Sequence, residues 1–430
     1  MSPGDEKVLE GSLLSDEFVR ELVAVGEVDL LVGVPTLNDA ESVAHVVQAA
    51  QLGFAKHFPR ERTVLVNADG GSRDGTPEVF MNAAVGDPHR LLASQMLRTM
   101  HRVSTQYRSS PGMAAPLRII IAAADLLRAK ACAIVSPDLA SINPAWIDNL
   151  LRPIYKESFD LATPLYDRHK FDGLLVSNFL YPMVRAACGK RLREPLATEF
   201  AFSGHLASHL LEQEFWREAE GGSSPEIWIT ALALMGDFRV CQSFLGPKVH
   251  GEKDSRQDLV TTLRRAVGTV FRCLEVQESH WLSKTGSEAV PTFGFPYEVA
   301  LEPVRFNRKR LLQMFRTGVT ELASILEVIL AEGTLREIQE IAKLDDRKFL
   351  YSDELWVKTI YDFSSAYHHS VMNRDHIIQS LAPLYRGRIG SFVLQNHAAS
   401  AETVEKAVEG LCQEYERLKP YWLDRWKSNK

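Results

Sequence analysis

The sequence carries no excess of positive charge. Its 49 Lys and Arg residues are outnumbered by 55 Asp and Glu residues, which gives the 430-residue chain a formal net charge of -6. A protein whose main partner is nucleic acid usually has a basic surface or stripe. The composition therefore predicts no nucleic-acid partner, and a negatively charged ligand would need a local basic or metal-containing site.

Long hydrophobic runs and clustered cysteines are also missing. No uncharged apolar run approaches the roughly 18 residues that a membrane-spanning helix needs, and the N-terminal MSPGDEKVLEG is too polar for a signal peptide. Cysteines are few and form no C-x-x-C pair; they are Cys132, Cys188, Cys241, Cys273 and Cys412. Three lie in apolar runs, as small buried residues do. We therefore expect a reducing, cytoplasmic location and no membrane span.

The first half of the chain alternates short apolar runs with helical patterns. Strands are predicted at DLLVGVP (29–35), TVLVNAD (63–69) and ACAIVSPD (131–138). A helix is expected from about Ala114 to Arg128, and SDEFVRELVAVG indicates another that Ser15 caps. This alternation predicts an α/β fold with a mostly parallel sheet.

The second half becomes increasingly helical. FDLATPLY (159–166) and FRVCQSFLG (238–246) are typical of strands, whereas almost everything after about residue 255 has a helical pattern. The Gly- and Pro-containing segment Lys284–Glu298 is the best linker candidate. We therefore predict a helical extension over 1–28, an α/β domain over 29–290 and a helical domain over 291–430. A helix pair of the last domain is the expected site of homodimerisation.

Three predicted strands end in small polar residues and aspartate. The segments are VPTLNDAES (34–42), NADGGSRDGT (67–76) and SPDLAS (136–141). In doubly wound sheets, ligands bind outside the carboxyl ends of the strands. One such segment is consistent with a simple polar turn, but three in one sheet indicate a shared crevice.

Two of these segments resemble glycosyltransferases of the GT-A fold. Pro35, Leu37 and Asn38, followed by Asp39 in place of Glu, are similar to the P-x-x-N-E turn of such enzymes. Asp69–Thr76 matches seven of eight positions of their D-D-G-S-x-D-G-T motif. The resemblance implies a Rossmann-like GT-A fold and a nucleotide-sugar donor, whose base Asp69 would hold. The alternative is a capped helix start after a turn.

Residues 29 to 275 resemble a narrower group, the glucosylglycerate, glucosyl-3-phosphoglycerate and mannosylglycerate synthases. The D-x-D motif of this group is reduced to Ser136, Pro137 and Asp138, and a later histidine matches His250 in FLGPKVHGEKD. The resemblance implies that Asp138 and His250 hold a divalent cation, Mg²⁺ or Mn²⁺. Such a cation would stabilise the charge of a departing nucleoside diphosphate.

The same resemblance implies the remaining site residues. For the donor nucleotide they are Pro35, Thr36, Leu37, Asn38, Asp39, Asp69, Gly71, Ser72, Gly112, Ser136 and Asp138; for the donor sugar or acceptor they are Glu199, Glu226, Lys170 and Asp172; for catalysis they are Glu226 and Asp138. Glu226 fits a plainer interpretation equally well, because a carboxylate at the start of a helix favours the helix dipole. The group retains anomeric configuration, either through a carboxylate nucleophile or by front-face attack, which the resemblance favours.

Two departures from the group concern the acceptor. Met113 stands where the phosphoglycerate enzymes have a lysine, and Leu174 and Leu175 stand near the place of an arginine. Phosphate is held best by arginine or lysine, so D-glycerate is the predicted acceptor and a glucosylglycerate-like compatible solute the product. Arg168, His169 or Lys170 would compensate for a phosphorylated acceptor, and Arg386 or Arg388 would reach an acceptor carboxylate.

Several alternatives stay open. The donor is a UDP-, GDP- or ADP-hexose, and its base and sugar are not fixed by the sequence. The acceptor is alternatively 3-phosphoglycerate or a larger glycan or lipid. Because Ser136 replaces the first aspartate of D-x-D, a nucleotide-sugar-binding protein without activity is the third hypothesis.

Overall fold

The chain folds into two compact units. The computed structural model describes residues 13–83, 100–107, 112–249, 258–296, 304 and 306–428. Unit 1 comprises Met1–Ala162, Thr198–Glu220 and Val249–Gly251, and unit 2 comprises Thr163–Ala197, Gly221–Lys248 and Glu252–Lys430. The chain therefore leaves unit 1 and returns to it twice. The domain boundaries expected from the sequence stay a prediction.

Unit 1 is built on a mostly parallel sheet. Its strands are β1 (Leu30–Thr36), β2 (Thr63–Asp69), β3 (His101–Gln106), β4 (Ala131–Ile134) and β7 (Phe200–Ser203), and β5 (Leu161–Asp167) begins here. The strand order is β5-β7-β4-β1-β2-β3. Strands β1, β2, β3 and β4 are parallel to their neighbours among these four, while β7 runs antiparallel to β4 and β5. Every residue of β1, β2 and β4 is buried, as in a sheet covered on both faces.

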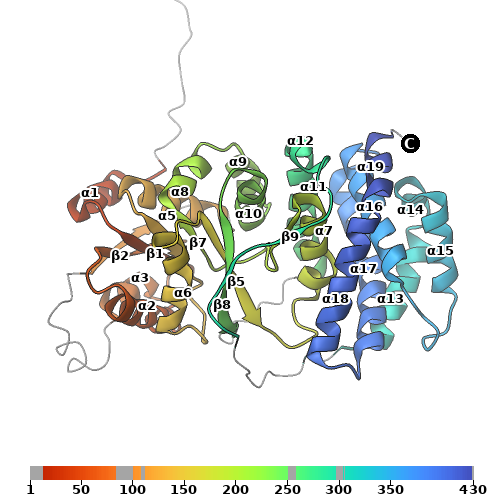
Figure 1. Ribbon diagram of the computed structural model, residues 1–430, viewed down its shortest axis with the longest axis horizontal. Coiled ribbons are helices and arrows are strands. Elements are labelled where there is room, and N and C mark those ends of the chain that lie inside the picture. The colour runs from red at the N-terminus through yellow and green to blue at the C-terminus, as the bar shows by residue number, and fades with distance from the viewer. Residues whose placement is uncertain are drawn as a thin grey trace, which may run out of the picture. The chain divides into compact units, whose positions relative to one another are not determined.

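Helices cover both faces of this sheet. They are α1 (Asp16–Val25), α2 (Val43–His57), α3 (Thr76–Asn82), α5 (Ala114–Leu126), α6 (Pro144–Tyr155), α8 (Gly204–Leu211) and α9 (Phe215–Glu220). In Figure 1, α2, α3 and α6 lie on one side of the strands and α5 and α8 on the other. Helix α5 packs so closely on β1 that a Cβ atom at Gly33 would lie 2.3 Å from Ile120. As predicted, Ser15 caps α1 by accepting from the Phe18 N–H at 3.2 Å.

Unit 2 is mainly helical. Its helices are the π-helix η1 (Val176–Leu180), α7 (Tyr181–Cys188), α10 (Pro225–Met235), α11 (Leu259–Val276), α12 (Glu278–Trp281), α13 (Arg308–Glu321), α14 (Ala323–Ile329), α15 (Glu332–Ala342), α16 (Asp353–His368), α17 (Arg374–Asn396), α18 (Ala401–Arg417) and α19 (Lys419–Lys427). Its strands are the end of β5, β6 (Lys190–Arg191), β8 (Val240–Pro247), β9 (Glu288–Ala289) and β10 (Thr292–Phe293). Strand β10 pairs in parallel with β8, and β6 with β9.

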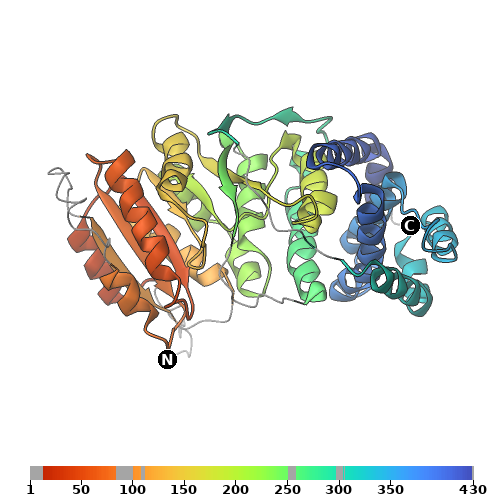
Figure 2. The same cartoon turned by 90° about the horizontal axis from the view of Figure 1, so that it is seen from below.

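Helices α13 and α17 form the tightest helix pair of unit 2. A Cβ atom at Gly318 of α13 would lie 2.3 Å from Pro383, and one at Gly387 of α17 would lie 2.5 Å from Phe315. Backbones approach this closely only where no side chain intervenes. The pair is therefore held in one register, and Figure 2 shows the C-terminal helices, in blue and teal, packed beside one another.

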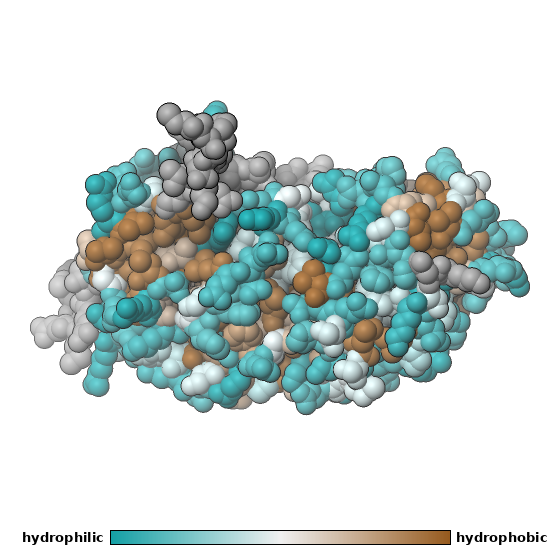
Figure 3. All heavy atoms as spheres, turned by 90° about the horizontal axis from the view of Figure 1, so that it is seen from above, coloured by the Kyte–Doolittle hydropathy of each residue, from teal (hydrophilic) through white to brown (hydrophobic). Residues whose placement is uncertain are grey.

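No helix among the described residues is long and apolar enough to cross a bilayer. On the face drawn in Figure 3, hydrophobic residues gather in separate groups between hydrophilic ones. All five cysteines are buried, as the sequence predicts for three of them, and none of them forms a disulfide.

The fold class expected from the sequence is confirmed, with three local differences. The architecture is α/β with a mostly parallel sheet, followed by a helical C-terminal region. Strand β3 is not predicted because HRVSTQ has only one fully buried side chain, and the short strand β7 is not predicted either. The linker prediction for Lys284–Glu298 is wrong, because β9 and β10 lie in it and β10 pairs with Gln242–Ser243 of β8. Such pairing depends on tertiary context rather than local composition.

A buried arginine joins α7 to α18 within unit 2. Arg185 is 1% exposed. Its two terminal nitrogens each donate a hydrogen bond to Glu409, at 2.6 and 2.9 Å. Its Nε donates to Glu416 at 2.7 Å. Burial opposes the charge, but the hydrogen bonds that Arg185 donates to Glu409 and Glu416 outweigh it and raise the pKa of Arg185. The cation is therefore permanently charged and tied to two acidic residues of α18.

We expect Arg185→Met to lower the free energy of unfolding by about 3 kcal/mol, because removing one member of a buried ion pair leaves its partners without compensation. Urea unfolding followed by circular dichroism measures the change. Arg417→Met is the matched control on α18, since Arg417 is an exposed partner of Glu414 and such pairs contribute little. Equal unfolding midpoints for the two variants would contradict a structural role for the Arg185 network.

Candidate functional site

The polar segments after β1, β2 and β4 meet at one edge of the unit 1 sheet. Strand β1 lies between β2 and β4 and runs parallel to both, with Thr36 directly opposite Asp69 in the register. The carboxyl ends of parallel neighbours lie at the same sheet edge. The crevice predicted from the three strand ends therefore has its residues on one edge, and Thr36 and Asp69 stand side by side at its centre.

The Asp69 carboxylate organises the turn that follows β2. It is fully buried, and its Oδ2 accepts from the backbone N–H groups of Gly71 at 3.0 Å and Ser72 at 2.8 Å. Its Oδ1 lies 2.9 Å from the Thr36 hydroxyl and 2.5 Å from the Ser72 hydroxyl, both donors. Each carboxylate oxygen thus has two partners. A buried charge is tolerated when its acceptor sites are filled in this way.

A second set of hydrogen bonds joins the β1 loop to the β2 loop. The backbone N–H of Asn38 donates to the Ser72 hydroxyl at 2.7 Å, and its side-chain oxygen accepts from the Arg73 N–H at 3.0 Å. Asn38 has φ 54, the left-handed region that asparagine tolerates better than most residues. Asp39 accepts from the Leu37 N–H at 2.7 Å and so closes its own turn.

The start of α3 completes the connection between the two loops. The Thr76 hydroxyl accepts from the Asp39 N–H at 2.8 Å and donates to Asp74 at 2.5 Å. Asp74 also accepts from the Ala40 N–H at 3.0 Å. The hydrogen bonds from Thr76 and Ala40 hold the pKa of Asp74 below its ordinary value. Asp39, Asp74 and Thr76 therefore serve to position the loops.

Tyr107 is a site residue that the sequence reasoning missed. Its backbone N–H donates to the Asp69 carbonyl at 2.9 Å. A Cβ atom at Gly70 would lie 3.3 Å from the Tyr107 hydroxyl and 3.2 Å from Leu37. Burial and the Asp69 charge raise the pKa of Tyr107 to about 12, so its hydroxyl remains a donor. Had β3 been recognised, an aromatic residue directly after it would have pointed to this edge.

Ser136 and Glu199 form a hydrogen-bonded pair at the end of β4. Strand β7 runs antiparallel to β4 with Phe200 opposite Ile134, which places Glu199 beside the residues that follow β4. Glu199 is fully buried and accepts from the Ser136 hydroxyl and from the Thr198 hydroxyl, the latter at 2.8 Å. The serine in the D-x-D position therefore donates to a carboxylate supplied by another strand.

Asp138 lies in a loop that is tied to Val249. Asp138 is half-buried. Two residues later, the Ala140 N–H donates to the Val249 carbonyl at 2.9 Å, and the Val249 N–H donates to the Ser141 hydroxyl at 3.0 Å. The predicted metal ligand His250 lies outside the described residues. Among the residues that are described, no group of three or more His, Cys, Asp or Glu side chains could hold a metal ion.

Gly71 and Gly112, both residues of the predicted nucleotide site, have open surroundings. Gly71 has φ 87 and Gly112 has φ 147, and no atom of the described residues lies within 4 Å of the place where either Cβ would be. Both conformations disfavour other residues. Leu37, a large apolar side chain, is 52% exposed in the β1 loop. Gly71 and Leu37 leave bare backbone and apolar surface beside the Asp69 network.

The predicted acceptor residues lie in unit 2, and Lys170 has a different role there. Its amino group donates to the carbonyls of Asn396, His397 and Ala399 at 3.2, 2.8 and 2.7 Å, so its three N–H groups are used at the end of α17. This is the way that a lysine satisfies the free carbonyls of a helix C-terminus. Lys170 is thus unavailable to an acceptor, which corrects its assignment from the sequence.

Glu226, Asp172 and Arg168 complete the predicted acceptor set. Glu226 is 3% exposed in the first turn of α10, where its charge favours the helix dipole. Asp172 accepts from the Gly173 N–H at 2.7 Å, and Arg168 donates to Glu194 at 3.1 Å. Burial raises the pKa of Glu194, while the charge of Arg168 opposes this.

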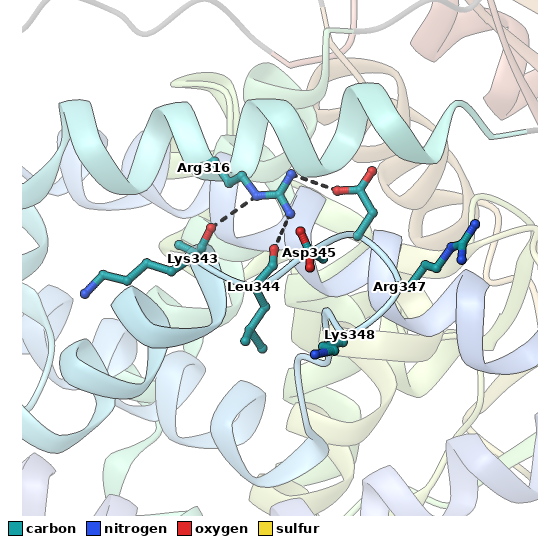
Figure 4. A pocket seen from close by; sticks show the side chains of 8 residues that line it. Arg316, Lys343, Leu344, Asp345, Arg347 and Lys348 are labelled. Atoms are coloured by element: carbon teal, nitrogen blue, oxygen red, sulfur yellow. Dashed lines mark hydrogen bonds and ion pairs between the residues drawn. The ribbon is translucent and has the colours of Figure 1, made fainter.

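The pocket in Figure 4 shows an arginine whose role is structural. It is lined by Arg316 of α13 and by the loop 342–348. Arg316 donates to the carbonyls of Ala342 and Leu344, at 3.1 and 2.6 Å, and to the Asp346 carboxylate at 2.8 Å. Its donors are therefore used to hold the loop between α15 and α16. Arg388 has a similar role, because it donates to Asn178 and Tyr351 at 3.0 Å each.

Comparison with known proteins finds likeness only among solved structures. No protein-family model and no curated protein sequence matches the chain. Similar structures include glucosyl-3-phosphoglycerate synthase from Mycobacterium tuberculosis in complex with Mn²⁺, UDP and phosphoglyceric acid (18% identity, TM-score 0.41, covering 60% of this chain and 82% of that chain). The same synthase with Mg²⁺ and UDP has 20% identity, TM-score 0.37 and coverages of 58% and 83%.

A structure described as that of a mycobacterial protein has 19% identity, TM-score 0.39 and coverages of 58% and 78%. The first two structures belong to the enzyme group that the sequence motifs resemble. The identities and TM-scores are too low to support an argument about function. The activity of this chain has to be inferred from its own residues.

The Ser136–Glu199 pair predicts a pH-dependent instability in Ser136→Asp. A second carboxylate facing the buried Glu199 would raise the pKa of at least one of the two in the folded state. At pH values above the raised pKa, the free energy of unfolding of the variant is then lower by about 2 kcal/mol. This loss disappears as the pH falls and one of the two carboxylates takes up a proton. We expect the thermal midpoint of Ser136→Asp to fall from pH 5 to pH 8 relative to wild type. Ser136→Asn, the neutral control, should show no such slope, and a parallel slope in both variants would contradict the pairing.

Proposed function

We propose that this protein is a metal-dependent glycosyltransferase. It transfers a glucosyl or mannosyl group from a nucleotide sugar to a small hydroxy acid such as D-glycerate, and it retains the anomeric configuration. The observation that carries this proposal is the pair of loops after β1 and β2. Hydrogen bonds join the two loops. The Asp69 carboxylate fills its acceptor sites with Gly71 and Ser72 of the β2 loop and with Thr36 at the end of β1.

The donor nucleotide is proposed to lie along these loops. Leu37 and Tyr107 flank Gly70, and together they offer an apolar and aromatic surface to a planar base. The open space at Gly71 and Gly112 lets a ligand approach the backbone closely, which suits a nucleotide. Because Asp69 already accepts from four groups, we assign it the role of fixing the loops for the base, with base contact as a further prediction.

Mg²⁺ or Mn²⁺ is proposed to be held by Asp138 and His250 together with the donor phosphates. These cations take oxygen ligands and commonly use one or two carboxylates plus substrate phosphates, which fits the single carboxylate of Asp138. His250 directly follows Val249 in the sequence, and the backbone of Val249 is hydrogen-bonded to Ala140 and Ser141. When bound, the cation supplies positive charge to the departing diphosphate.

The donor sugar and the acceptor are proposed to contact carboxylates. Glu199 serves the donor sugar, and Glu226 and Asp172 serve the acceptor. Arg168 replaces Lys170 as the cation for the acceptor carboxylate, because its Nε is buried without a hydrogen-bond partner among the described residues. Front-face attack, in which the leaving phosphate takes the acceptor proton, requires no protein nucleophile and is the mechanism we favour. A 3-phosphoglycerate acceptor is the alternative.

A product screen tests the activity. Purified protein is incubated with UDP-glucose, GDP-mannose or ADP-glucose, with D-glycerate or 3-phosphoglycerate and with Mg²⁺ or Mn²⁺, and nucleoside diphosphate release is measured. We expect release with at least one donor only when glycerate and metal are both present. Nucleoside diphosphate release with 3-phosphoglycerate but not with D-glycerate would change the assigned acceptor to 3-phosphoglycerate. No release, with donor binding still detected by calorimetry, would favour an inactive nucleotide-sugar-binding protein.

Asp138→Asn and His250→Ala should each reduce metal-stimulated turnover by about 100-fold or more, because several kcal/mol of leaving-group stabilisation depend on the cation. Asp237→Asn and His280→Ala are the controls, since both residues are exposed and neither is among the proposed site residues. Nucleoside diphosphate release is measured against metal concentration. Wild-type metal dependence in either site variant would show that the cation is bound elsewhere.

Gly71→Ala should weaken donor binding beyond its effect on stability. Gly71 and Gly26 both have positive φ, 87 and 71, with open space at the Cβ position. Alanine therefore costs on the order of 1–3 kcal/mol of backbone strain at either site. Calorimetric titration with the active nucleotide sugar should show a loss of affinity of at least about tenfold for Gly71→Ala and none for Gly26→Ala. Equal affinities of Gly71→Ala and Gly26→Ala for the nucleotide sugar would show that Gly71 is not part of the donor site.

A further inference from the structure

A second pocket in unit 2 is lined by none of the residues that are assigned above to the proposed transfer reaction. It has a volume of about 440 Å³, which is in the range of small-molecule sites. Its walls come from the start of α13, from the middle of α17 and from neighbouring residues of unit 2. The lining residues are Leu174, Leu259, Phe306, Asn307, Arg310, Leu311, Met314, Tyr385, Arg386 and Ile389.

Two arginines of this pocket have donors from which no described residue accepts. Within the part of the chain that the structure describes, the guanidinium groups of Arg310 and Arg386 make no hydrogen bond or ion pair. Burial lowers the pKa of Arg386, the charge of Asp258 opposes this, and the charge of Arg310 adds to the lowering. Arg310 is exposed and Arg386 is half-buried. A bound anion would accept hydrogen bonds from both guanidinium groups.

Three structural arginines of unit 2 provide a contrast. Arg185, Arg316 and Arg388 each donate to at least two carboxylates, amides or carbonyls of the protein. An arginine used for structure has its donors filled in this way. The donors of Arg310 and Arg386 are left available to a ligand that enters the pocket.

Tyr385 adds a third donor. Its side chain is 8% exposed, it lines the pocket, and its hydroxyl has no hydrogen-bond partner among the residues that are described. Burial raises the pKa of Tyr385, so the hydroxyl keeps its proton. The hydroxyl is thus a third donor on the pocket wall for a ligand with acceptor oxygens.

The positions of these donors are fixed by the close packing of their helices. Arg310 is on α13 and Arg386 on α17, and Gly387, next to Arg386, lies against Phe315 of α13. The distance between the two helices cannot increase without separating these contacts. The N-terminus of α13 also faces the pocket through Asn307, and its dipole favours a negative charge. The pocket is thus a preformed place for an anionic group.

The remaining walls are apolar and define the rest of the ligand. Leu174, Leu259, Leu311, Met314 and Ile389 provide aliphatic side chains, and Phe306 an aromatic one. A small inorganic ion would leave this surface exposed to water, at a cost of about 25 cal/mol per Å² relative to covering it. We propose that the pocket binds a small amphiphilic anion, which has one carboxylate or phosphate group held by Arg310, Arg386 and Tyr385 and a hydrocarbon body against the apolar wall.

Octanoate and octyl phosphate are the probes for this site, with octyl glucoside as the uncharged analogue and inorganic phosphate as the anion without a hydrocarbon body. Isothermal calorimetry on the full chain at low ionic strength measures binding. We expect at least one octyl anion to bind at least tenfold more tightly than octyl glucoside and than inorganic phosphate. The proposal is overturned if neither octyl anion binds, or if inorganic phosphate or the uncharged analogue binds as well as they do.

Variants locate the binding. Arg310→Met and Arg386→Met should each weaken the tighter octyl anion about tenfold, since a charge-assisted hydrogen bond is lost, and Tyr385→Phe should weaken it several-fold. Lys309→Met is the control, because Lys309 is an exposed cation of the same helix that does not line the pocket. Arg310 is exposed as well, so its variant is expected to fold. Undiminished binding to Arg310→Met, or an equal loss in Lys309→Met, would overturn the assignment whatever the stability of the Arg386 variant.

Discussion

A single buried carboxylate holds the candidate donor site together. Ordering a glycine-rich loop is costly, because each residue loses about 1–2 kcal/mol of backbone entropy on folding and glycine loses the most. Asp69 offsets this cost by accepting from the backbone N–H groups of Gly71 and Ser72 and from the hydroxyls of Ser72 and of Thr36, the last residue of β1. Because those partners fill its acceptor sites, the charge is tolerated inside the protein. The loops are therefore already ordered before any ligand arrives.

Local composition was enough to predict the parts of the fold that depend on local signals. Strands β1, β2 and β4 are fully buried and appear as apolar runs, and the helix before β1 has its cap at Ser15. Strand β3 was missed because most of its residues are polar and only partly buried. Pairing of β10 with β8 depends on residues 50 positions apart, which no local pattern contains.

The same limit explains which site residues were predicted. The residue types of the Asp69–Thr76 segment are enough by themselves to predict its turn. Lys170 looked like a free cation, but its partners are carbonyls 226 to 229 positions later in the chain. Whether a cation binds a ligand or the protein depends on such distant contacts. Arg310 and Arg386 could be separated from the structural arginines only after the helices of unit 2 were placed.

The Ser136–Glu199 pair changes the meaning of the missing aspartate at position 136. The sequence alone shows a lost carboxylate, whereas the antiparallel pairing of β7 with β4 brings Glu199 to the same place from 63 residues away. The Ser136 hydroxyl gives its only proton to Glu199, so its lone pairs are left to accept from, or coordinate, another group. Without a fixed acceptor such as Glu199, the hydroxyl of Ser136 would be able to rotate and donate in other directions. Held by a buried carboxylate, it becomes an oriented oxygen at the edge where Asp138 also lies, which is a feature that a nucleotide-sugar site can use without a second aspartate.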